Sequence, residues 1–508
     1  MSRKMRIPTR VIFFFLIFAT ISLHAVDPGR PHGVISDGTT GTLVSGLVNY
    51  TVSGGVINGG NLFHSFASFN IHSGESVMFT SSGITNLIIR VTGTDYSWLN
   101  GQITSSATRI YIMNSEGENL GNSFIFSGAN GCHLTSAHYI RLGAGTDRFY
   151  SDLASASSLS AAAPGAFGFL STSTGPIVLD GCDPLSTLVP VSVIGGNIAL
   201  QNNAVLDNHG GGTGRIDLAS VASAGEVVPT ATGLDVSSFS AFGMITVEAG
   251  SELKTEKLFT AGDVTVGGNW NVIATEFEAM SPSTVTFSGV ASQNIHGTNR
   301  FDNLILSNPN GLQLNSEVVV KGVLTFSQGL FILGSGNLTL GLSATIAGSP
   351  SATAMVVATS SGEMRKKFSG PGSFLFPVGD ADGTAEYSPV SVDFSSGSFG
   401  AGSYVGVKVK DDKHPNNGYP GDHLTRYWII NENAITGFSS DATCHYVDAD
   451  ITGVEANIRG AKYDLGSWTA LDLVNIAANT LSGTVTSFGD FSGVHQSVPV
   501  ELMSFSVE

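Results

Sequence analysis

The sequence predicts an all-β protein, with a parallel β-solenoid followed by an antiparallel β-sandwich-like domain. Glycine supplies 63 of the 508 residues, and charged residues make up 12%, about half of the roughly 25% usual in globular domains. Short runs of β-branched and aromatic residues recur along the chain, bounded by Gly, Asn, Ser or Asp, which tolerate turns. No convincing amphipathic helix exceeds two turns, and residues 151–167 are the best candidate for one short helix.

Composition and charge exclude several classes of protein. The 23 basic and 40 acidic residues give a formal charge of −17, so the chain lacks the basic patch that a nucleic-acid partner requires. Because 42% of the residues are apolar, the chain can bury a large core and is not disordered. Three cysteines are too few for a disulfide scaffold. Cys132 and Cys182 form either one disulfide or two separate buried thiols.

Residues 1–25 have the composition of a secretory signal peptide. The apolar run 11–23 is too short to span a bilayer comfortably, and the small Ala25 marks the expected cleavage site. We therefore expect export through the periplasm, with an uncleaved membrane anchor as the alternative. The basic region before the apolar run contains Arg3, Lys4, Arg6 and Arg10.

The segment from residue 26 to residue 365 has the strand pattern of a solenoid. Between Ile198 and Leu340 the strand-like runs are very short, and Asn and Gly stand at their ends. This pattern suits a parallel β-helix, in which each coil stacks on the next around a continuous apolar seam. The low charge agrees, because like charges on stacked coils repel. A β-propeller is the alternative, but the chain shows no regular period of about 40 residues.

The composition changes near Glu363, where the basic segment 364–368 begins. The strand-like runs beyond it are longer and alternate, as in Ser403–Lys410. We therefore expect an antiparallel β-sandwich-like domain over residues 366–497, followed by a linker or truncated C-terminal tail at 498–508.

The search for chemistry finds no convincing catalytic or metal site. Asp207, Arg215 and Asp217 lie close in sequence, but turns and solenoid strands account for them, and no nucleophile or zinc motif occurs. Asp380 and Asp382 partly match a calcium loop, but the later bidentate acid is missing, so we expect an exposed β-turn. We expect no enzyme activity, no cofactor and no metal. A polysaccharide-active β-helix enzyme is the alternative.

Three ordered motifs resemble the filamentous-haemagglutinin-type secretion domain of two-partner secretion (TPS) exoproteins. They are GGNLFHSFASFNIHSGESVMF at 59–79, NLIIRVTGTDYSWLNGQI at 86–103 and RIYIMNSEGENLG at 109–121. The segments 164–170 and 191–228 resemble the closing coils of that family. The resemblance implies a right-handed parallel β-helix, with a secretion domain at 26–235 and a solenoid extension at 236–365.

The resemblance also implies a function and a partner. A secreted or surface-exposed, adhesin-like exoprotein would be carried across the outer membrane by a β-barrel transporter, and its target would be a host-cell, cell-surface or glycan ligand. The expected transporter-recognition residues are Asn114 and Gly117 in a turn, with His64 and Arg90 beside it. His64 is otherwise expected to be a packed strand residue. A purely structural cell-surface spacer is the second alternative.

One turn departs from the family pattern. The family's Asn-Pro-Asn-Gly turn is Asn-Ser-Glu-Gly at 114–117, so the proline that fixes φ is absent. An Asn-Pro-Asn-Gly sequence does occur at 308–311, outside the family region, where we expect an ordinary solenoid corner.

The C-terminal part resembles modules of large secreted proteins from Bacteroidetes and Chlorobi-like bacteria. The resemblance lies in segments such as GNWNV at 268–272, FLFPVGDADGTAEYSPV at 374–390 and the ending VPVELMSFSVE at 498–508. In such proteins the last stretch often precedes a C-terminal sorting module, and we expect that module to be lost or absent here.

Overall fold

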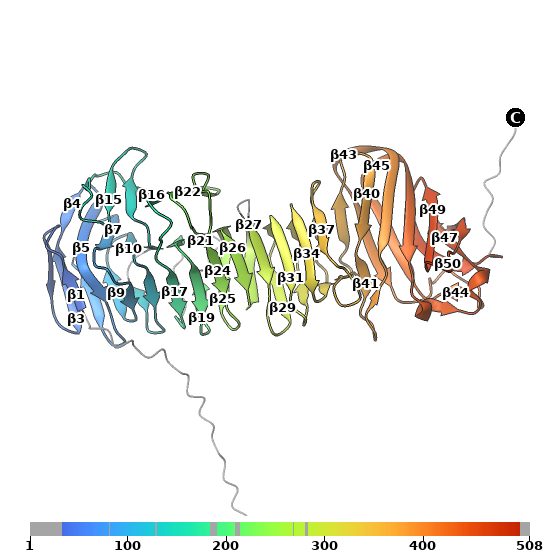
Figure 1. The fold of residues 1–508 in the computed structure, drawn as a ribbon, viewed down its shortest axis with the longest axis horizontal. Coiled ribbons are helices and arrows are strands. Elements are labelled where there is room, and N and C mark those ends of the chain that lie inside the picture. Colours follow the sequence, from blue (N-terminus) through green and yellow to red (C-terminus); the bar gives the residue numbers. More distant parts are fainter. Residues whose placement is uncertain are drawn as a thin grey trace, which may run out of the picture.

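The computed structural model describes residues 33–497, except residues 81, 128–129, 183–189, 209–213, 268 and 280–282. The expected signal peptide at 1–25 and the expected tail at 498–508 lie outside the described residues. The molecule is elongated, and the chain advances from one end to the other along its long axis (Figure 1).

The central part is a parallel β-helix whose coils each pass through three sheet faces. Strands of successive coils pair in parallel on each face, as β7, β10 and β13 do on the first. Two long strands, β25 (Glu252–Ala261) and β27 (Asn269–Ala279), bend from one face to the next, so β25 pairs with both β20 and β21. The fold class predicted from the sequence is confirmed for this part of the chain.

The first face consists of β5 (Asn61–Asn70), β7 (Asn86–Val91), β10 (Arg109–Asn114), β13 (Gly131–Thr135), β18 (Val191–Gly195), β21 (Arg215–Ser220), β30 (Asn299–Phe301), β33 (Val318–Val320), β36 (Leu338–Leu340) and β39 (Met364–Lys367). The second face consists of β8 (Ser97–Leu99), β11 (Glu118–Leu120), β17 (Ile177–Asp180), β19 (Ile198–Gln201), β24 (Met244–Val247), β26 (Asp263–Val266), β28 (Thr284–Phe287), β31 (Asn303–Ser307), β34 (Val323–Gln328) and β37 (Thr345–Gly348). The third face consists of β3 (Asn49–Gly54), β6 (Ser76–Phe79), β9 (Gln102–Ser105), β12 (Ile125–Ser127), β20 (Val205–Asp207), β29 (Gln293–His296), β32 (Leu312–Leu314), β35 (Phe331–Leu333) and β38 (Val356–Val357).

The solenoid core is built from columns of apolar side chains that repeat at the same register in successive coils. One such column on the first face is fully buried and runs through Ile89, Ile112, Leu134, Val193 and Leu218. Each side chain of this size stabilises the fold by about 1.5–3 kcal/mol when it leaves water. Each side chain of the column is buried by the coils on either side of it. Neighbouring coils therefore stabilise one another.

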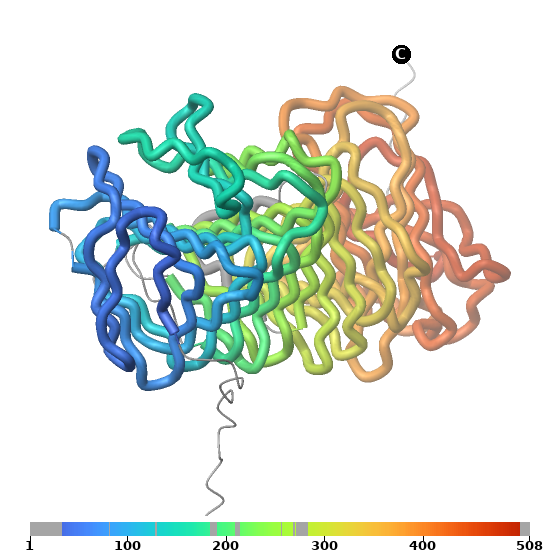
Figure 2. Tube along the Cα trace, turned by 60° about the vertical axis from the view of Figure 1, so that its left-hand side comes forward, coloured from blue at the N-terminus to red at the C-terminus, as the bar shows by residue number. Residues whose placement is uncertain are grey.

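A second, antiparallel sheet packs on the outside of the first face. It encloses a separate apolar cluster that includes Tyr111, Ile140, Phe149, Phe167 and Val227. Figure 2 shows its first strands, in teal, beside the stacked coils. Its strands are β14 (Tyr139–Leu142), β15 (Arg148–Tyr150), β16 (Pro164–Phe169), β22 (Gly225–Thr230) and β23 (Gly233–Asp235).

The helix expected within residues 151–167 is not formed. Turns and irregular backbone occupy residues 151–163, and β16 begins at Pro164. The Ala- and Ser-rich composition suggested a helix, but this segment has to cross back over the solenoid, and contacts with the first face fix its path. Asn61, for example, donates hydrogen bonds to the carbonyls of Ser160 and Ala162.

The strands beyond β39 are antiparallel, with the exception of the parallel pair β38–β41. β39 pairs in parallel with β36 and antiparallel with β43, and one apolar core includes both Met364 and Val407. Strand pairing is therefore continuous across the expected boundary at 365–366. The domain boundaries and the sandwich arrangement stay predictions.

The C-terminal strands are β40 (Gly372–Phe376), β41 (Val378–Asp380), β42 (Glu386–Tyr387), β43 (Val390–Lys410), β44 (His423–Leu424), β45 (Tyr427–His445), β46 (Ile451–Thr452), β47 (Ile458–Asp464), β48 (Ser467–Leu473), β49 (Thr480–Val485) and β50 (Gly489–His495). Two short 3₁₀ helices, Asp448–Asp450 and Glu455–Asn457, are the only helices in the described part of the chain. Within residues 33–497 as described, no helix is both long and apolar enough to cross a bilayer.

The apolar columns make the solenoid sensitive to a buried charge, and Ile216 belongs to a second column that also contains Val191 and Cys132. Ile216 is fully buried on β21, so Ile216→Asp should lower the free energy of unfolding by more than about 4 kcal/mol. Met244→Asp is the matched control, because Met244 is half exposed on β24 of the second face. Thermal unfolding followed by circular dichroism measures both. An Ile216→Asp protein as stable as the Met244→Asp protein would contradict the buried column.

Candidate functional site

The first coil of the solenoid is closed by a cap of four short strands. This N-terminal cap comprises residues 33–58, with β1 (Gly33–Ser36), β2 (Thr42–Ser45), β3 and β4 (Val56–Asn58). β1 and β4 pair antiparallel with β5, and β2 pairs antiparallel with β3. The edge of the first coil is therefore covered. A strand of another protein could pair with this end of the molecule only at an edge of the cap.

The N-terminal cap exposes an unusual number of large apolar side chains. One of them, Leu43, is on β2, which is the terminal strand of its five-stranded sheet and pairs only with β3. An edge strand has backbone N–H and C=O groups available to another chain, and exposed apolar side chains are typical of protein contact surfaces. The exposed residues are Ile35 (55%), Leu43 (65%), Leu47 (86%), Val48 (51%) and Ile57 (61%).

His64 lies inside the first coil and not on the surface. Its side chain is 1% exposed, its Nδ1 lies 2.9 Å from Thr42 Oγ1, and its ring lies beside Phe79. Burial lowers the pKa of His64 to about 4, so the imidazole is neutral at pH 7. His64 thus joins the cap strand β2 to the solenoid core.

Arg90 is a buried link between the N-terminal cap, the first face and the outer sheet. Its guanidinium donates hydrogen bonds to Ser65 Oγ at 2.6 Å, to Thr39 Oγ1 at 2.9 Å and to the Tyr150 carbonyl at 2.8 Å. It also lies 4.6 Å from the centre of the Phe149 ring. These contacts join three segments that are far apart in sequence. Arg90 therefore holds the cap, the first face and the outer sheet together, and its buried guanidinium is not exposed to a partner.

The turn at 114–117 forms although its proline is missing. The Gly117 N–H donates to the Asn114 carbonyl at 2.9 Å, and Gly117 has a φ of +109°, which a glycine adopts readily. The Asn114 side chain accepts from the Glu116 N–H and donates to Ser97 Oγ and the Asp95 carbonyl. Asn114 is fully buried, so only Ser115 and Glu116 at the tip of the turn face solvent.

The turn at 308–311 has the same geometry. The Gly311 N–H donates to the Asn308 carbonyl at 3.0 Å, and the Asn310 N–H donates to Asn308 Oδ1 at 2.8 Å. It is the solenoid corner that the sequence predicted. The Asn-x-x-Gly turn is therefore a structural element of this solenoid and is not specific to the region that resembles a secretion domain.

The four expected recognition residues lie on or next to three neighbouring strands, but their side chains do not form one site. His64 is on β5, Arg90 on β7 and Asn114 at the end of β10, and each has its own partners. The exposed apolar surface of the N-terminal cap was not predicted from the sequence. Its signal in the sequence is the pair Leu47–Val48 between Gly46 and Asn49, where a polar turn is usual.

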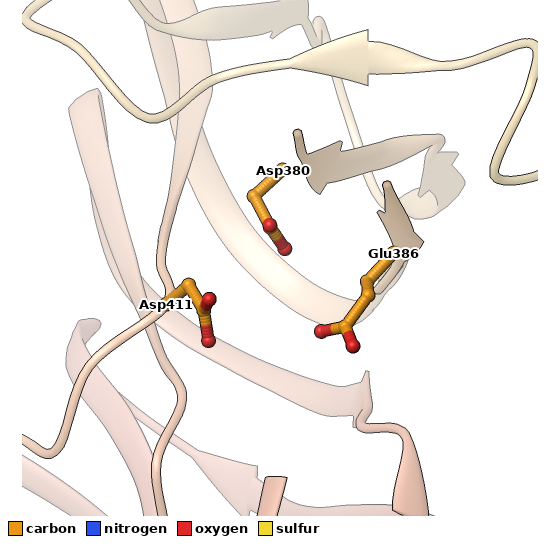
Figure 3. Close-up of side chains that lie close together, drawn as sticks. All are labelled: Asp380, Glu386 and Asp411. Carbon is orange, nitrogen blue, oxygen red and sulfur yellow. The ribbon is translucent and has the colours of Figure 1, made fainter. Parts of the chain in front are cut away.

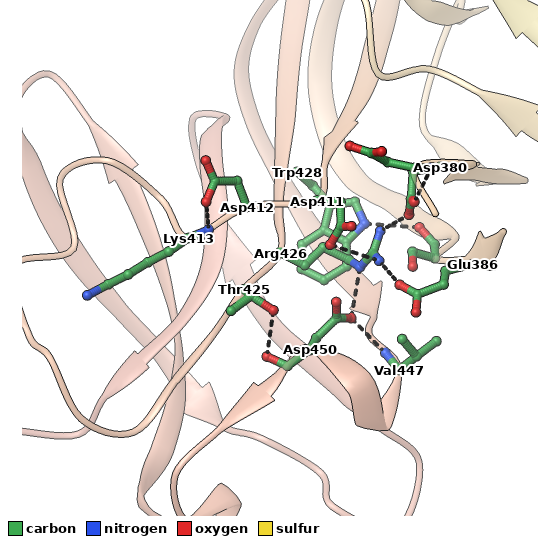
Figure 4. Close-up of polar contacts among 12 residues, drawn as sticks. Asp380, Glu386, Asp411, Asp412, Lys413, Thr425, Arg426, Trp428, Val447 and Asp450 are labelled. Carbon is green, nitrogen blue, oxygen red and sulfur yellow. Dashed lines mark hydrogen bonds and ion pairs between the residues drawn. The ribbon is translucent and has the colours of Figure 1, made fainter. Parts of the chain in front are cut away.

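An acidic cluster surrounds a buried arginine near the C-terminal end of the solenoid. Asp380, Glu386 and Asp411 come close enough to share an ion (Figure 3). The Arg426 guanidinium lies among them and forms ion pairs with Asp380 and Glu386, with Asp450 at 2.8 Å and with Asp411 at 3.6 Å (Figure 4). The exposed turn expected at Asp380 is therefore wrong for that residue, which is fully buried, while Asp382 is exposed.

The guanidinium of Arg426 takes the place that a cation would have in this cluster. Its side chain is fully buried, and the surrounding carboxylates raise its pKa further despite burial. Burial raises the pKa of Glu386 and of Asp411, against the opposing effect of Arg426. The network joins Arg426, the residue before β45, to carboxylates on β41, on β42, after β43 and in the 3₁₀ helix at 448–450.

Two further expectations have direct outcomes. Cys132 and Cys182 are both buried and do not form a disulfide, so the alternative of two separate thiols holds. Arg215 and Asp217 form an ion pair at 2.8 Å, and Arg215 also donates to the carbonyls of Thr230 and Gly233. Arg215 thus attaches the outer sheet to the first face.

The neutral state of His64 predicts that acid weakens the N-terminal cap. Because its folded pKa is lowered from 6.5 to about 4, its contribution is present above pH 6.5 and is lost as the pH falls toward 4. The loss amounts to about 3 kcal/mol at most. Hydrogen exchange of residues 33–58 between pH 7 and pH 4 measures it, and His64→Gln should remove most of the dependence. Equal pH dependence in both proteins would refute this origin.

The two Asn-x-x-Gly turns predict matched effects on stability. Asn114→Ala and Asn308→Ala each leave buried backbone groups without a partner, so each should cost about 1–3 kcal/mol of stability. Denaturant unfolding of the two variants gives the comparison. A loss at Asn308 with none at Asn114 would show that the first turn contributes nothing to folding.

Comparison with known families finds a match for the N-terminal half of the chain. Residues 32–274 match the family model of the TPS secretion domain, and the match extends beyond residue 235, the expected end of that domain. The crystal structure of the HMW1 secretion domain from Haemophilus influenzae is similar at 15% identity and a TM-score of 0.29, covering 65% of this chain and 94% of that one. No curated protein sequence matches the chain. Residues 32–274 therefore match a TPS secretion domain, and this match supports the two-partner secretion exoprotein that the sequence predicted.

Proposed function

We propose that the N-terminal cap is the surface that binds the partner transporter. The observation that carries this proposal is the exposed apolar set on the cap, led by Leu47 at 86% exposure, next to the edge strand β2. A periplasmic domain of the transporter would add a strand to β2 and cover Leu43 and Leu47. The turn residues Ser115 and Glu116 are the second contact, with Asn114 and Gly117 fixing their position.

The architecture also supports a mechanism for movement through the transporter. A coil gains most of its stability from the coil before it, so folding proceeds outward from an end that has already formed. With the cap held at the transporter, each coil that emerges outside the cell folds on its predecessor. Folding of each coil then opposes backward movement of the chain.

After transport, the protein acts in this proposal as an adhesin-like molecule at the cell surface or in the medium. The long solenoid holds its far end away from the secretion domain (Figure 1). No enzyme activity belongs to the proposal, because Arg215, Asp217 and the Arg426 cluster are occupied by structural ion pairs. A polysaccharide-active enzyme would be recognised by turnover in a panel of lyase and hydrolase substrates.

The cap proposal predicts opposite outcomes for two exposed leucines. Leu47→Asp should reduce release into the medium at least tenfold when the full chain is expressed with its transporter, because a charge replaces an apolar contact. Leu465→Asp is the matched control, since Leu465 is 99% exposed at the other end of the molecule. Immunoblots of medium and periplasm measure release. Unchanged secretion of Leu47→Asp, or of a chain lacking residues 30–235, would overturn the proposal.

A further inference from the structure

A cavity of about 360 Å³ lies between the first face of the solenoid and the outer sheet. Its floor is the outward side of the first face, and Phe167, Pro164 and Pro229 from the outer sheet form one wall. The volume is at the lower end of the range for small-molecule sites, which suits a single ring. None of the TPS features described above uses this cavity.

The floor of the cavity is a ladder of side chains in register on successive coils. Tyr111, His133, Ser192 and Asp217 occupy equivalent positions on β10, β13, β18 and β21. The rings of Tyr111 and His133 stack with centres 4.3 Å apart and an angle of 14°. His133 Nδ1 lies 3.0 Å from Ser192 Oγ, and Asp217 at the next position forms an ion pair with Arg215 at 2.8 Å.

His133 is held in the ladder through Nδ1, which shares a hydrogen bond with Ser192 Oγ. Asp217 accepts from the Arg215 side chain. Burial lowers the pKa of His133 to about 3, so the ring is neutral at pH 7.

Nε2 of His133 is a buried polar atom with no hydrogen-bond partner. The residue is 8% exposed and lines the cavity. Buried polar atoms are nearly always paired, so an unpaired one beside an open cavity indicates a missing partner. The order of the ladder excludes a hydrolase triad, because the serine lies between the histidine and the aspartate. The ladder is therefore suited to binding a hydroxyl group.

Arg109 supplies the positive charge of the cavity. It is exposed and lines the cavity, and its guanidinium forms no hydrogen bond or ion pair within the described part of the chain. Arg215, in contrast, is neutralised by Asp217. The chain has a formal charge of −17, so acidic partners for an arginine are plentiful, and Arg109 nevertheless has none. Its planar guanidinium is well shaped to bind the carboxylate of a ligand.

We propose that this cavity binds an acidic monosaccharide unit, a hexuronate. Arg109 pairs with the carboxylate, His133 Nε2 forms a hydrogen bond with a ring hydroxyl, and the apolar face of the sugar ring packs on Phe167 and Pro164. The unit is either a free uronate or the end of an acidic polysaccharide. The proposal deepens the adhesin-like role, but it is tested on purified protein, so its failure leaves the transporter proposal untouched.

The test is ligand-observed saturation-transfer NMR, with calorimetry where affinity allows, on the purified mature chain. The probes are glucuronate, galacturonate, trigalacturonate, the neutral hexoses glucose and galactose, and lactate. At least one uronate should bind saturably and at least tenfold more tightly than the neutral sugars and lactate. Tighter binding of trigalacturonate than of the monosaccharides identifies a polysaccharide end as the ligand, and the reverse identifies the free sugar.

Two variants and one control separate the roles of the residues. Arg109→Gln should weaken uronate binding at least tenfold and leave the melting temperature unchanged, because Arg109 is exposed. His133→Phe keeps the ring stack on Tyr111 but removes the hydrogen-bonding Nε2, and should weaken binding about fivefold or more. Arg300→Gln changes an exposed arginine on a later coil of the same face and should have no effect. The absence of saturable binding by any uronate, equal binding of neutral sugars, or an unaffected Arg109→Gln protein would overturn the proposal.

Discussion

Coil-to-coil stacking is the interaction on which the rest of the structure depends. A single coil cannot bury its apolar face or satisfy its backbone groups, so every coil requires a neighbour on each side. The parallel register that places Ile112 under Leu134 also aligns their backbone hydrogen bonds. The same register places polar side chains of successive coils next to one another on the outside. The ladder of His133, Ser192 and Asp217 is thus a consequence of stacking.

The requirement for neighbours makes the two ends of the solenoid special. The first coil has no predecessor, and the N-terminal cap covers it with antiparallel strands. At the other end, β43 pairs antiparallel with β39 and stops the parallel repeat. Near each end lies a buried arginine, Arg90 or Arg426, that joins segments distant in sequence. A multivalent guanidinium suits such a junction, because it satisfies several acceptors at once.

The two arginines illustrate different ways to stabilise a buried cation. Arg90 is bound mainly by hydroxyl and carbonyl oxygens and by the face of Phe149, so the charge has little direct compensation. Arg426 lies among four carboxylates and leaves that cluster with excess negative charge. The raised pKa of Glu386 and of Asp411 follows from this crowding together with burial. The junctions therefore differ in charge although they serve the same structural purpose.

The sequence by itself determined the solenoid and its family. Short strands, Asn and Gly at corners and low charge recur along the chain because each coil repeats the same requirement. The corner at 308–311 was predicted for the same reason, and the turn at 114–117 was predicted from the family resemblance. Only the tertiary structure decided which residues share a site. His64, Arg90 and Asn114 are close in the strand register but point into different environments, and Asp380 meets Arg426 across 46 positions of the chain. Side-chain direction and long-range pairing depend on how coils, cap and outer sheet pack together, and that information is not present in any one segment of the sequence.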